Sequence, residues 1–117
     1  MQSGPFAGHS EGSMSTFGNR LKEARLRAGL SGEALGVRIG VDETAAATRI
    51  SRYETGDRAP AHEIAALLAD ALNVPVAFLY CDDNGMARLL LSFAKLGARD
   101  QARAVDFVEG LASTRPR

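Results

Sequence analysis

Residues 50–60, ISRYETGDRAP, combine the end of an amphipathic helix with a charged turn. Ile50 and Tyr53 are three positions apart and therefore lie on one face of a helix. Arg52 is a cation on that helix, Gly56 can end it, and an arginine and a proline follow in the turn. The stretch predicts a cationic helix that stops abruptly before a charged turn.

Short amphipathic helices are predicted on both sides of this stretch, each bounded by a capping residue or a glycine. The first can be capped by Ser15 or Thr16 and ends before Gly29. No segment alternates apolar and polar residues for long enough to form a strand. The predicted fold class is therefore all-α. The expected helices cover about 17–28, 32–39, 43–54, 61–72, 76–80, 86–96 and 99–112.

The composition of the 117 residues excludes several classes of protein. Lys and Arg number 14, as do Asp and Glu, so net charge indicates neither a nucleic-acid nor a membrane partner. The single cysteine, Cys81, excludes an internal disulfide and a cysteine metal cage, and fits a reducing cytoplasm. Apolar runs are far shorter than the roughly 20 residues of a membrane span. Residues 1–14, rich in glycine and serine, are predicted to be a disordered leader or an expression scar.

The connection between the second and third expected helices consists only of Gly40 and Val41, followed by Asp42 as the capping residue of the third helix. A short glycine-containing turn between two brief helices is the geometry of a helix-turn-helix, whose second helix enters the DNA major groove. The helix over 43–54 has one apolar face that can pack on a core. Its opposite face carries small or hydrogen-bonding residues, and arginines there can bind guanine or phosphate. These residues are Ala45, Thr48, Arg49 and Arg52.

Charge is unevenly distributed along the chain. Residues 15–60 contain eight Lys and Arg against six Asp and Glu, whereas residues 61–85 contain four Asp and Glu and no cation. The cations are therefore placed where phosphates would lie, although a solvated charged surface is the alternative for any one of them. They are Arg20, Lys22, Arg25, Arg27, Arg38, Arg49, Arg52 and Arg58.

Four segments in order resemble the Cro/phage-repressor (Xre-type) helix-turn-helix domain. They are FGNRLKEARLRAGLS (17–31), ALGVRIGV (34–41), RISRYETGDRAP (49–60) and IAALLADALNVPVAFL (64–79). The later segment LLLSFAKLGARDQARAVDFVEGLA (89–112) is similar to the helical hairpin that often follows this domain in small bacterial regulators. The resemblance implies a five-helix lambda-repressor-like DNA-binding domain at 15–82, followed by a C-terminal helical hairpin at 83–117. It also implies a homodimer on a palindromic operator, usually as a repressor.

The resemblance and the helix faces together assign expected roles to individual residues. Base contacts are expected from Thr44, Ala45, Thr48, Arg49 and Arg52. Phosphate contacts are expected from Ser31, Gly32, Arg38 and Arg58. By resemblance, a structural ion pair is expected between Arg25 and Glu54. A dimer interface is expected from Phe78, Leu79, Leu90, Phe93, Phe107 and Leu111.

Two features depart from the family pattern. Gly32 stands where members usually carry a glutamine that reaches DNA, so only backbone N–H groups remain there to bind a phosphate. Eight residues rather than about four separate Val41 from Ile50. Four extra residues are close to one helical turn, about 6 Å. We expect a recognition helix that is one turn longer at its N-terminus, and a longer loop is the alternative.

An enzyme is not expected, because the sequence has no phosphate-binding glycine loop, no metal-ligand spacing and no nucleophile–base set. For the same reason no cofactor and no metal are expected. One alternative to a repressor is the antitoxin of a toxin–antitoxin pair, which would bind both its operator and a toxin protein. A second alternative is a purely structural helical bundle that does not bind DNA.

Overall fold

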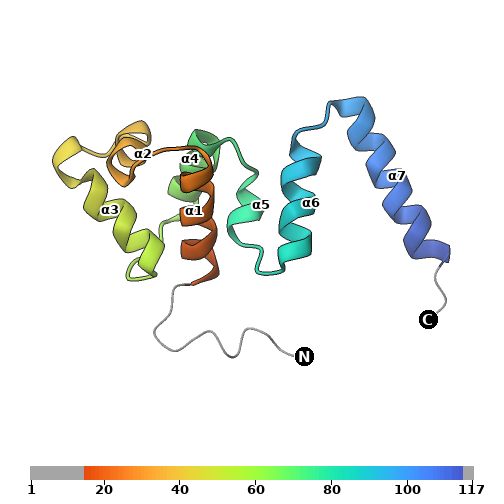
Figure 1. The fold of residues 1–117 in the computed structure, drawn as a ribbon, viewed down its shortest axis with the longest axis horizontal. Helices are drawn as coiled ribbons and strands as arrows, with labels where there is room; N and C mark the ends of the chain where they lie inside the picture. Colours follow the sequence, from red (N-terminus) through yellow and green to blue (C-terminus); the bar gives the residue numbers. More distant parts are fainter. Residues whose placement is uncertain (1–14, 115–117) are drawn as a thin grey trace.

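A computed structural model describes residues 15–114 of the chain (Figure 1). This part is all-α, as predicted, and contains seven helices and no strand. The leader predicted at residues 1–14 lies outside the described residues. Within them, no helix is long and apolar enough to cross a membrane. The helices are α1 (Thr16–Arg27), α2 (Gly32–Arg38), α3 (Glu43–Thr55), α4 (His62–Leu72), α5 (Val76–Leu79), α6 (Asn84–Ala94) and α7 (Ala98–Thr114).

The described chain is elongated, with principal extents of 54 × 36 × 23 Å. Helices α1 to α5 form one body, with α2 and α3 at one end of the long axis (Figure 1). Helix α6 stands beside α5, and α7 lies at the opposite end of the molecule from α3 (Figure 1). The helices α2 and α3, which resemble a helix-turn-helix, are therefore far from the C-terminal helix α7.

The third helix is the longer one that we expected. Helix α3 has 13 residues and begins at Glu43, so the extra residues extend the helix and not the turn. The Asp42 carboxylate caps it by accepting hydrogen bonds from the backbone N–H and the hydroxyl of Thr44. The hydrogen bond from the Thr44 hydroxyl lowers the pKa of Asp42 from its ordinary value. Gly56, with φ of 84°, ends the helix in the left-handed conformation.

The start of α6 differs from the prediction. The segment 81–85 was expected to be a break and the helix to start near Met86, but α6 begins at Asn84. The reason is an N-cap that the apolar pattern did not show: the Asp83 carboxylate accepts a hydrogen bond of 2.7 Å from the Met86 N–H. Asn84 and Gly85 therefore belong to the helix.

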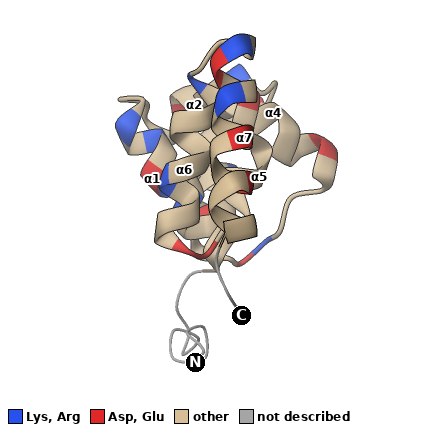
Figure 2. Cartoon of the chain, turned by 90° about the vertical axis from the view of Figure 1, so that its right-hand side faces the viewer, with Lys and Arg blue, Asp and Glu red and all other residues tan. Residues whose placement is uncertain are grey.

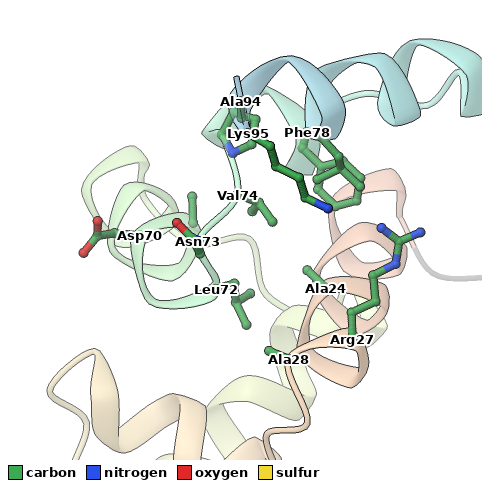
Figure 3. Close-up of a pocket in the computed structure, with 13 residues that line it drawn as sticks. Ala24, Arg27, Ala28, Asp70, Leu72, Asn73, Val74, Phe78, Ala94 and Lys95 are labelled. Atoms are coloured by element: carbon green, nitrogen blue, oxygen red, sulfur yellow. The ribbon is translucent and has the colours of Figure 1, made fainter. Parts of the chain in front are cut away.

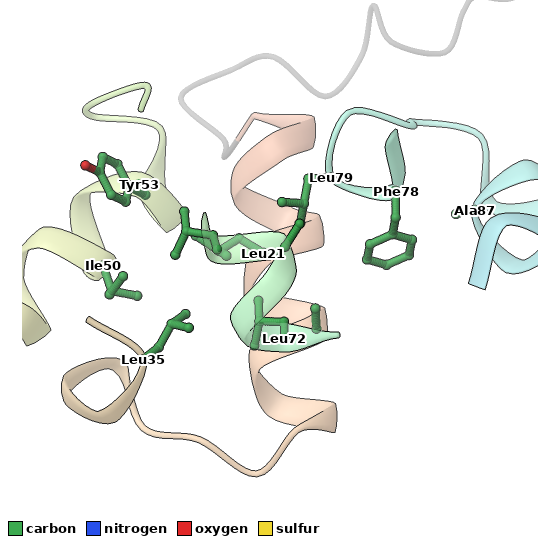
Figure 4. Close-up of a cluster of buried hydrophobic side chains, with 11 residues drawn as sticks. Leu21, Leu35, Ile50, Tyr53, Leu72, Phe78, Leu79 and Ala87 are labelled. Carbon is green, nitrogen blue, oxygen red and sulfur yellow. The ribbon is translucent and has the colours of Figure 1, made fainter. Parts of the chain in front are cut away.

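The apolar core joins α1 to α5 (Figure 4). Tyr53 and Phe78 are buried, whereas Phe17 is only partly buried and its ring packs against Tyr80 with centroids 5.2 Å apart. The largest fully buried side chains, one or two from each of these five helices, are Leu21, Leu35, Ile50, Leu68, Phe78 and Leu79.

The burial of Phe78 and Leu79 corrects one expectation. Their side chains are 1% and 0% exposed in the single chain, because α5 inserts them between α1 and α4. They were expected to contribute to a dimer interface, but neither offers surface to a second copy. The other apolar residues named for that interface lie on α6 and α7.

Two glycines bring α1 and α2 very close to the backbone of α3. A Cβ atom on Gly36 would lie 2.6 Å from the Ala46 Cβ, and one on Gly18 would lie 2.2 Å from the Glu54 carbonyl oxygen. Real Cβ atoms do not approach other atoms so closely, so both positions require glycine. Helix α3 is therefore held near both of its ends by neighbouring backbones.

This contact predicts opposite effects for alanine at two glycines of α2. Gly36→Ala should lower the free energy of unfolding by about 1–3 kcal/mol, because overpacking outweighs the gain in helix propensity. In the control Gly32→Ala, the nearest atoms lie 3.8 Å from the new Cβ, so stability should rise by about 0.4–1 kcal/mol. Urea denaturation measures both, and a stabilised Gly36→Ala variant would contradict the close packing.

Candidate nucleic-acid interface

The face of α3 opposite the core is polar and exposed. Ala46, Ile50 and Tyr53 point into the core, so Thr44, Thr48 and Arg52 face solvent as predicted. Ser51 and Thr55 are exposed between and beyond them. Both were missed in the sequence, although their spacing of three and seven residues from Thr48 places them on the same helix face. This face offers hydroxyl groups and one guanidinium to a groove.

Ala45 and Arg49 are half-buried and lie at the side of α3, not at the centre of its exposed face. Arg52 is half-exposed, and its Nε lies 4.0 Å from Oδ2 of Asp57 in the following turn. Such an exposed pair is weak, so the Arg52 side chain remains free to bind another acceptor. Of the five residues expected to contact bases, three lie at the centre of the exposed face.

The expected ion pair between Arg25 and Glu54 is present and bidentate. Nε of Arg25 lies 2.6 Å from one carboxylate oxygen of Glu54, and a terminal nitrogen lies 3.1 Å from the other. The other terminal nitrogen of Arg25 donates to the Leu30 carbonyl at 3.0 Å. Glu54 is only 7% exposed, and its hydrogen bonds raise the pKa of Arg25. One side chain of α1 thus ties the end of α3 to the loop before α2.

The N-terminus of α2 is capped within the chain. The Ser31 hydroxyl accepts a hydrogen bond of 3.0 Å from the Ala34 N–H, and Gly32 packs on the side of Ile50. Glu33 is an exposed anion in the first turn of α2. A phosphate at Ser31 and Gly32 would therefore meet one negative side chain as well as backbone N–H groups.

Two exposed arginines lie beyond the two ends of α3. Arg38 is the last residue of α2, just before the turn that leads into α3. Arg58 lies in the turn after α3, where its N–H donates to the Arg52 carbonyl at 3.1 Å. The expected phosphate contacts thus flank the helix that carries the expected base contacts.

Not all cations of residues 15–60 are available to phosphates, which corrects the reading of that group. Arg20 is nine-tenths buried, and its guanidinium binds the chain near α6, away from α3. Arg25 is engaged with Glu54. Arg27 is exposed but lies 3.2 Å from Glu23 on the same helix. Of these three arginines, only Arg25 was assigned an internal partner by resemblance, and the sequence did not reveal the contacts of Arg20 and Arg27.

A surface hollow of about 470 Å³ lies apart from α3, between the C-terminal ends of α1, α4 and α6. Arg27 and Lys95 lie on one side of it and Asp70 on the opposite side (Figure 3). None of the residues expected to contact DNA lines it. Among the described residues, no group of three His, Cys, Asp or Glu side chains could hold a metal ion.

Comparison with known proteins agrees with this geometry. Residues 16–78 match the family model of a helix-turn-helix domain. The crystal structure of the transcriptional regulator BswR is similar to this chain, with a TM-score of 0.78 and 37% sequence identity. The match covers 84% of this chain and 98% of BswR. No curated protein matches the chain. The matched region contains α1 to α4 and most of α5, including the polar face of α3, and we conclude that the chain belongs to the helix-turn-helix domain family.

Proposed function

We propose that this protein is a cytoplasmic, homodimeric transcriptional repressor that binds a palindromic operator with α3 in the major groove. One observation carries the proposal: a polar helix face is exposed on a helix whose backbone is fixed by α1 and α2. The helix-turn-helix family and the likeness to a transcriptional regulator support DNA as the partner. The repressor assignment rests on the resemblance to phage repressors.

Base reading is assigned to the exposed face of α3. Hydroxyl groups of threonine and serine can donate to or accept from any base edge, whereas a guanidinium binds guanine O6 and N7 together. We therefore assign the strongest base contact to Arg52. Thr44, Thr48 and Ser51 are assigned supporting contacts, and Ala45 and Arg49 contacts at the side of the helix.

Positioning on the duplex is assigned to groups around that helix. Arg38 and Arg58 would bind phosphates on the two sides of the groove, and the N-terminus of α2 at Ser31 and Gly32 would bind a third. The anions Glu33, Asp42 and Glu43 near the start of α2 and α3 would reduce attraction to DNA of unrelated sequence. The arrangement favours recognition by base contacts over general adhesion to the backbone.

Dimerisation is assigned to the C-terminal hairpin predicted at 83–117, of which α6 and α7 are the described helices. Helix α7 buries no residue, and its exposed apolar side chains lie among charged residues of both signs (Figure 2). Phe107 is 67% exposed, and Leu111 is also exposed. Between the two helices lies an apolar groove of about 270 Å³ that contains Leu90 and Phe93. Exposed apolar area of this kind favours a symmetric partner, and DNA reading by one short helix requires a second copy.

The same apolar surface supports one alternative partner. An antitoxin would cover α6 and α7 with a toxin protein while still binding its operator through α3. Co-purification of a second small protein that is displaced by substitutions at Phe107 would favour this alternative over the homodimer.

Selection from random duplex DNA tests the proposed function. The full chain should enrich a two-fold symmetric sequence with half-site centres about 34–36 Å or a multiple apart. Absence of any enriched sequence at low salt would contradict sequence-specific binding.

Arg52→Ala should relax specificity at one base position. The variant should lose about 1–3 kcal/mol of binding free energy on the selected operator and much less on random duplex. Fluorescence anisotropy with both duplexes measures the difference, and Arg27→Ala, at an exposed arginine of α1 paired with Glu23, is the matched control. Equal losses of binding free energy on both duplexes would show that Arg52 contacts a phosphate and not a base.

Arg38→Ala and Arg58→Ala should weaken binding to all duplexes alike. Each substitution should reduce the slope of log affinity against log salt by about one unit, because one phosphate is no longer neutralised. The control is again Arg27→Ala, whose side chain is paired with Glu23 and is assigned no phosphate contact. A slope identical to that of the wild type would show that the replaced arginine does not contact a phosphate.

Glutamate at both Phe107 and Leu111 should convert the dimer to a monomer. Both side chains are exposed, so the double variant should keep its helical content while like charges oppose each other across the interface. Sedimentation velocity at micromolar concentration measures the mass. Leu26→Glu, at an apolar residue of α1 that is 60% exposed, is the control and should remain dimeric. A dimeric double variant would exclude this face as the interface.

A further inference from the structure

The joint between the body and the C-terminal hairpin contains little apolar packing. Ala87 is the one buried residue of α6, and Leu91 is only partly buried against the apolar core. Two surface hollows reach this joint: the hollow of about 470 Å³ and a smaller one of about 150 Å³ are both lined by Phe78 and Leu91. Packing alone therefore restricts the angle of α6 only weakly.

A buried arginine of α1 makes directional contacts across this joint. Nε of Arg20 donates to the Cys81 carbonyl at 2.6 Å, and one terminal nitrogen donates to Oδ1 of Asn84 at 3.0 Å. The other terminal nitrogen donates to Glu23 at 3.0 Å on its own helix. The guanidinium also lies 5.5 Å from the centroid of the Phe78 ring. Arg20 thus binds the first residues after α5 and the first residue of α6 at once.

The geometry of guanidinium makes this contact suited to fixing an angle. Its donors lie in one plane at fixed directions, so two acceptors bound together define an orientation as well as a distance. The side chain is 9% exposed, and shielding from water strengthens hydrogen bonds to a charged donor. Glu23 balances the charge from the side that faces solvent.

We propose that Arg20 is a positioning residue that fixes the angle between the DNA-reading body and the C-terminal hairpin, and thereby sets the half-site spacing. This inference rests on the proposed function, because half-site spacing exists only for a dimer on DNA. Arg20 itself lies away from the exposed face of α3 and is assigned no contact with DNA.

The elongated shape amplifies small rotations at this joint. Helices α3 and α7 lie at opposite ends of a 54 Å long axis, and the joint lies between them (Figure 1). A rotation of about 10° would move α3 by roughly 5 Å, whereas one base pair advances the groove by about 3.4 Å. Loss of the Arg20 contacts should therefore allow one dimer to reach several spacings.

The test is a set of operators in which the two half-sites are moved apart or together one base pair at a time. Full-length wild-type protein should prefer one spacing and lose at least about fivefold in affinity one base pair away, because one half-site loses a contact. Arg20→Met keeps an unbranched apolar side chain beside Phe78 but removes the three donor nitrogens of the guanidinium. For this variant, the loss of affinity at a spacing one base pair from the preferred one should be less than about twofold. Its affinity for an isolated half-site should equal that of the wild type.

Two further variants separate positioning from general stability. Asn84→Ala removes one acceptor at an exposed residue of α6, and should flatten the spacing profile partly without unfolding the chain. Arg27→Met removes an exposed arginine from the same helix as Arg20, and should keep the wild-type profile. If circular dichroism shows that Arg20→Met does not fold, the spacing profile of Asn84→Ala tests the proposed role of the Arg20 contacts.

An unchanged spacing profile in folded Arg20→Met or in Asn84→Ala would overturn the inference, and so would a uniform loss at every spacing. A wild-type protein that binds its operator without any preferred spacing would also overturn it while leaving the proposed function intact. If the wild-type protein selects no sequence, the proposed function itself fails.

Discussion

The position of α3 depends on three contacts that its neighbours make with its backbone and its last turn. Gly36 allows α2 to approach Ala46, Gly18 allows α1 to approach the carbonyl of Glu54, and Arg25 binds the Glu54 side chain. The two contacts with Glu54 join segments that are distant in the sequence, and the contact of Gly36 with Ala46 joins consecutive helices. In other proteins, removing one partner of a buried ion pair costs about 3–5 kcal/mol, because a charge is left without compensation. These contacts leave α3 little freedom to move relative to the body, which is what recognition of individual base edges requires.

The two ends of the molecule have different chemistry. The end formed by α2 and α3 exposes hydroxyl groups and arginines, together with several anions. The opposite end, formed by α6 and α7, exposes aromatic and aliphatic side chains. Both ends carry acidic and basic residues, so the difference between them lies in the exposed apolar side chains of α6 and α7 and not in net charge. If α6 and α7 associate as we propose, the DNA-reading faces remain uncovered, and their separation is set at the joint where Arg20 binds.

Local signals in the sequence predicted most of the helices and the exposed face of α3. Capping and left-handed positions such as Asp42 and Gly56 act within one turn of their own helix, so they can be read without knowledge of the fold. Contacts between distant segments were harder to predict. Gly36 could not be recognised as a packing residue, because its neighbour Ala46 lies on another helix. Nothing in the sequence distinguishes Arg20 from an exposed arginine, and only the fold shows that it faces α6.

Methylation interference on the selected operator would test most directly whether α3 lies in the major groove. Dimethyl sulfate modifies guanine N7, which faces the major groove, and adenine N3, which faces the minor groove. N7 methylation at guanines in both half-sites should prevent the wild-type protein from binding the operator. Binding of the Arg52→Ala variant should no longer depend on N7 methylation at one of these guanines in each half-site. Interference confined to adenine N3, or absent from the guanines of both half-sites, would contradict the placement of α3 in the major groove.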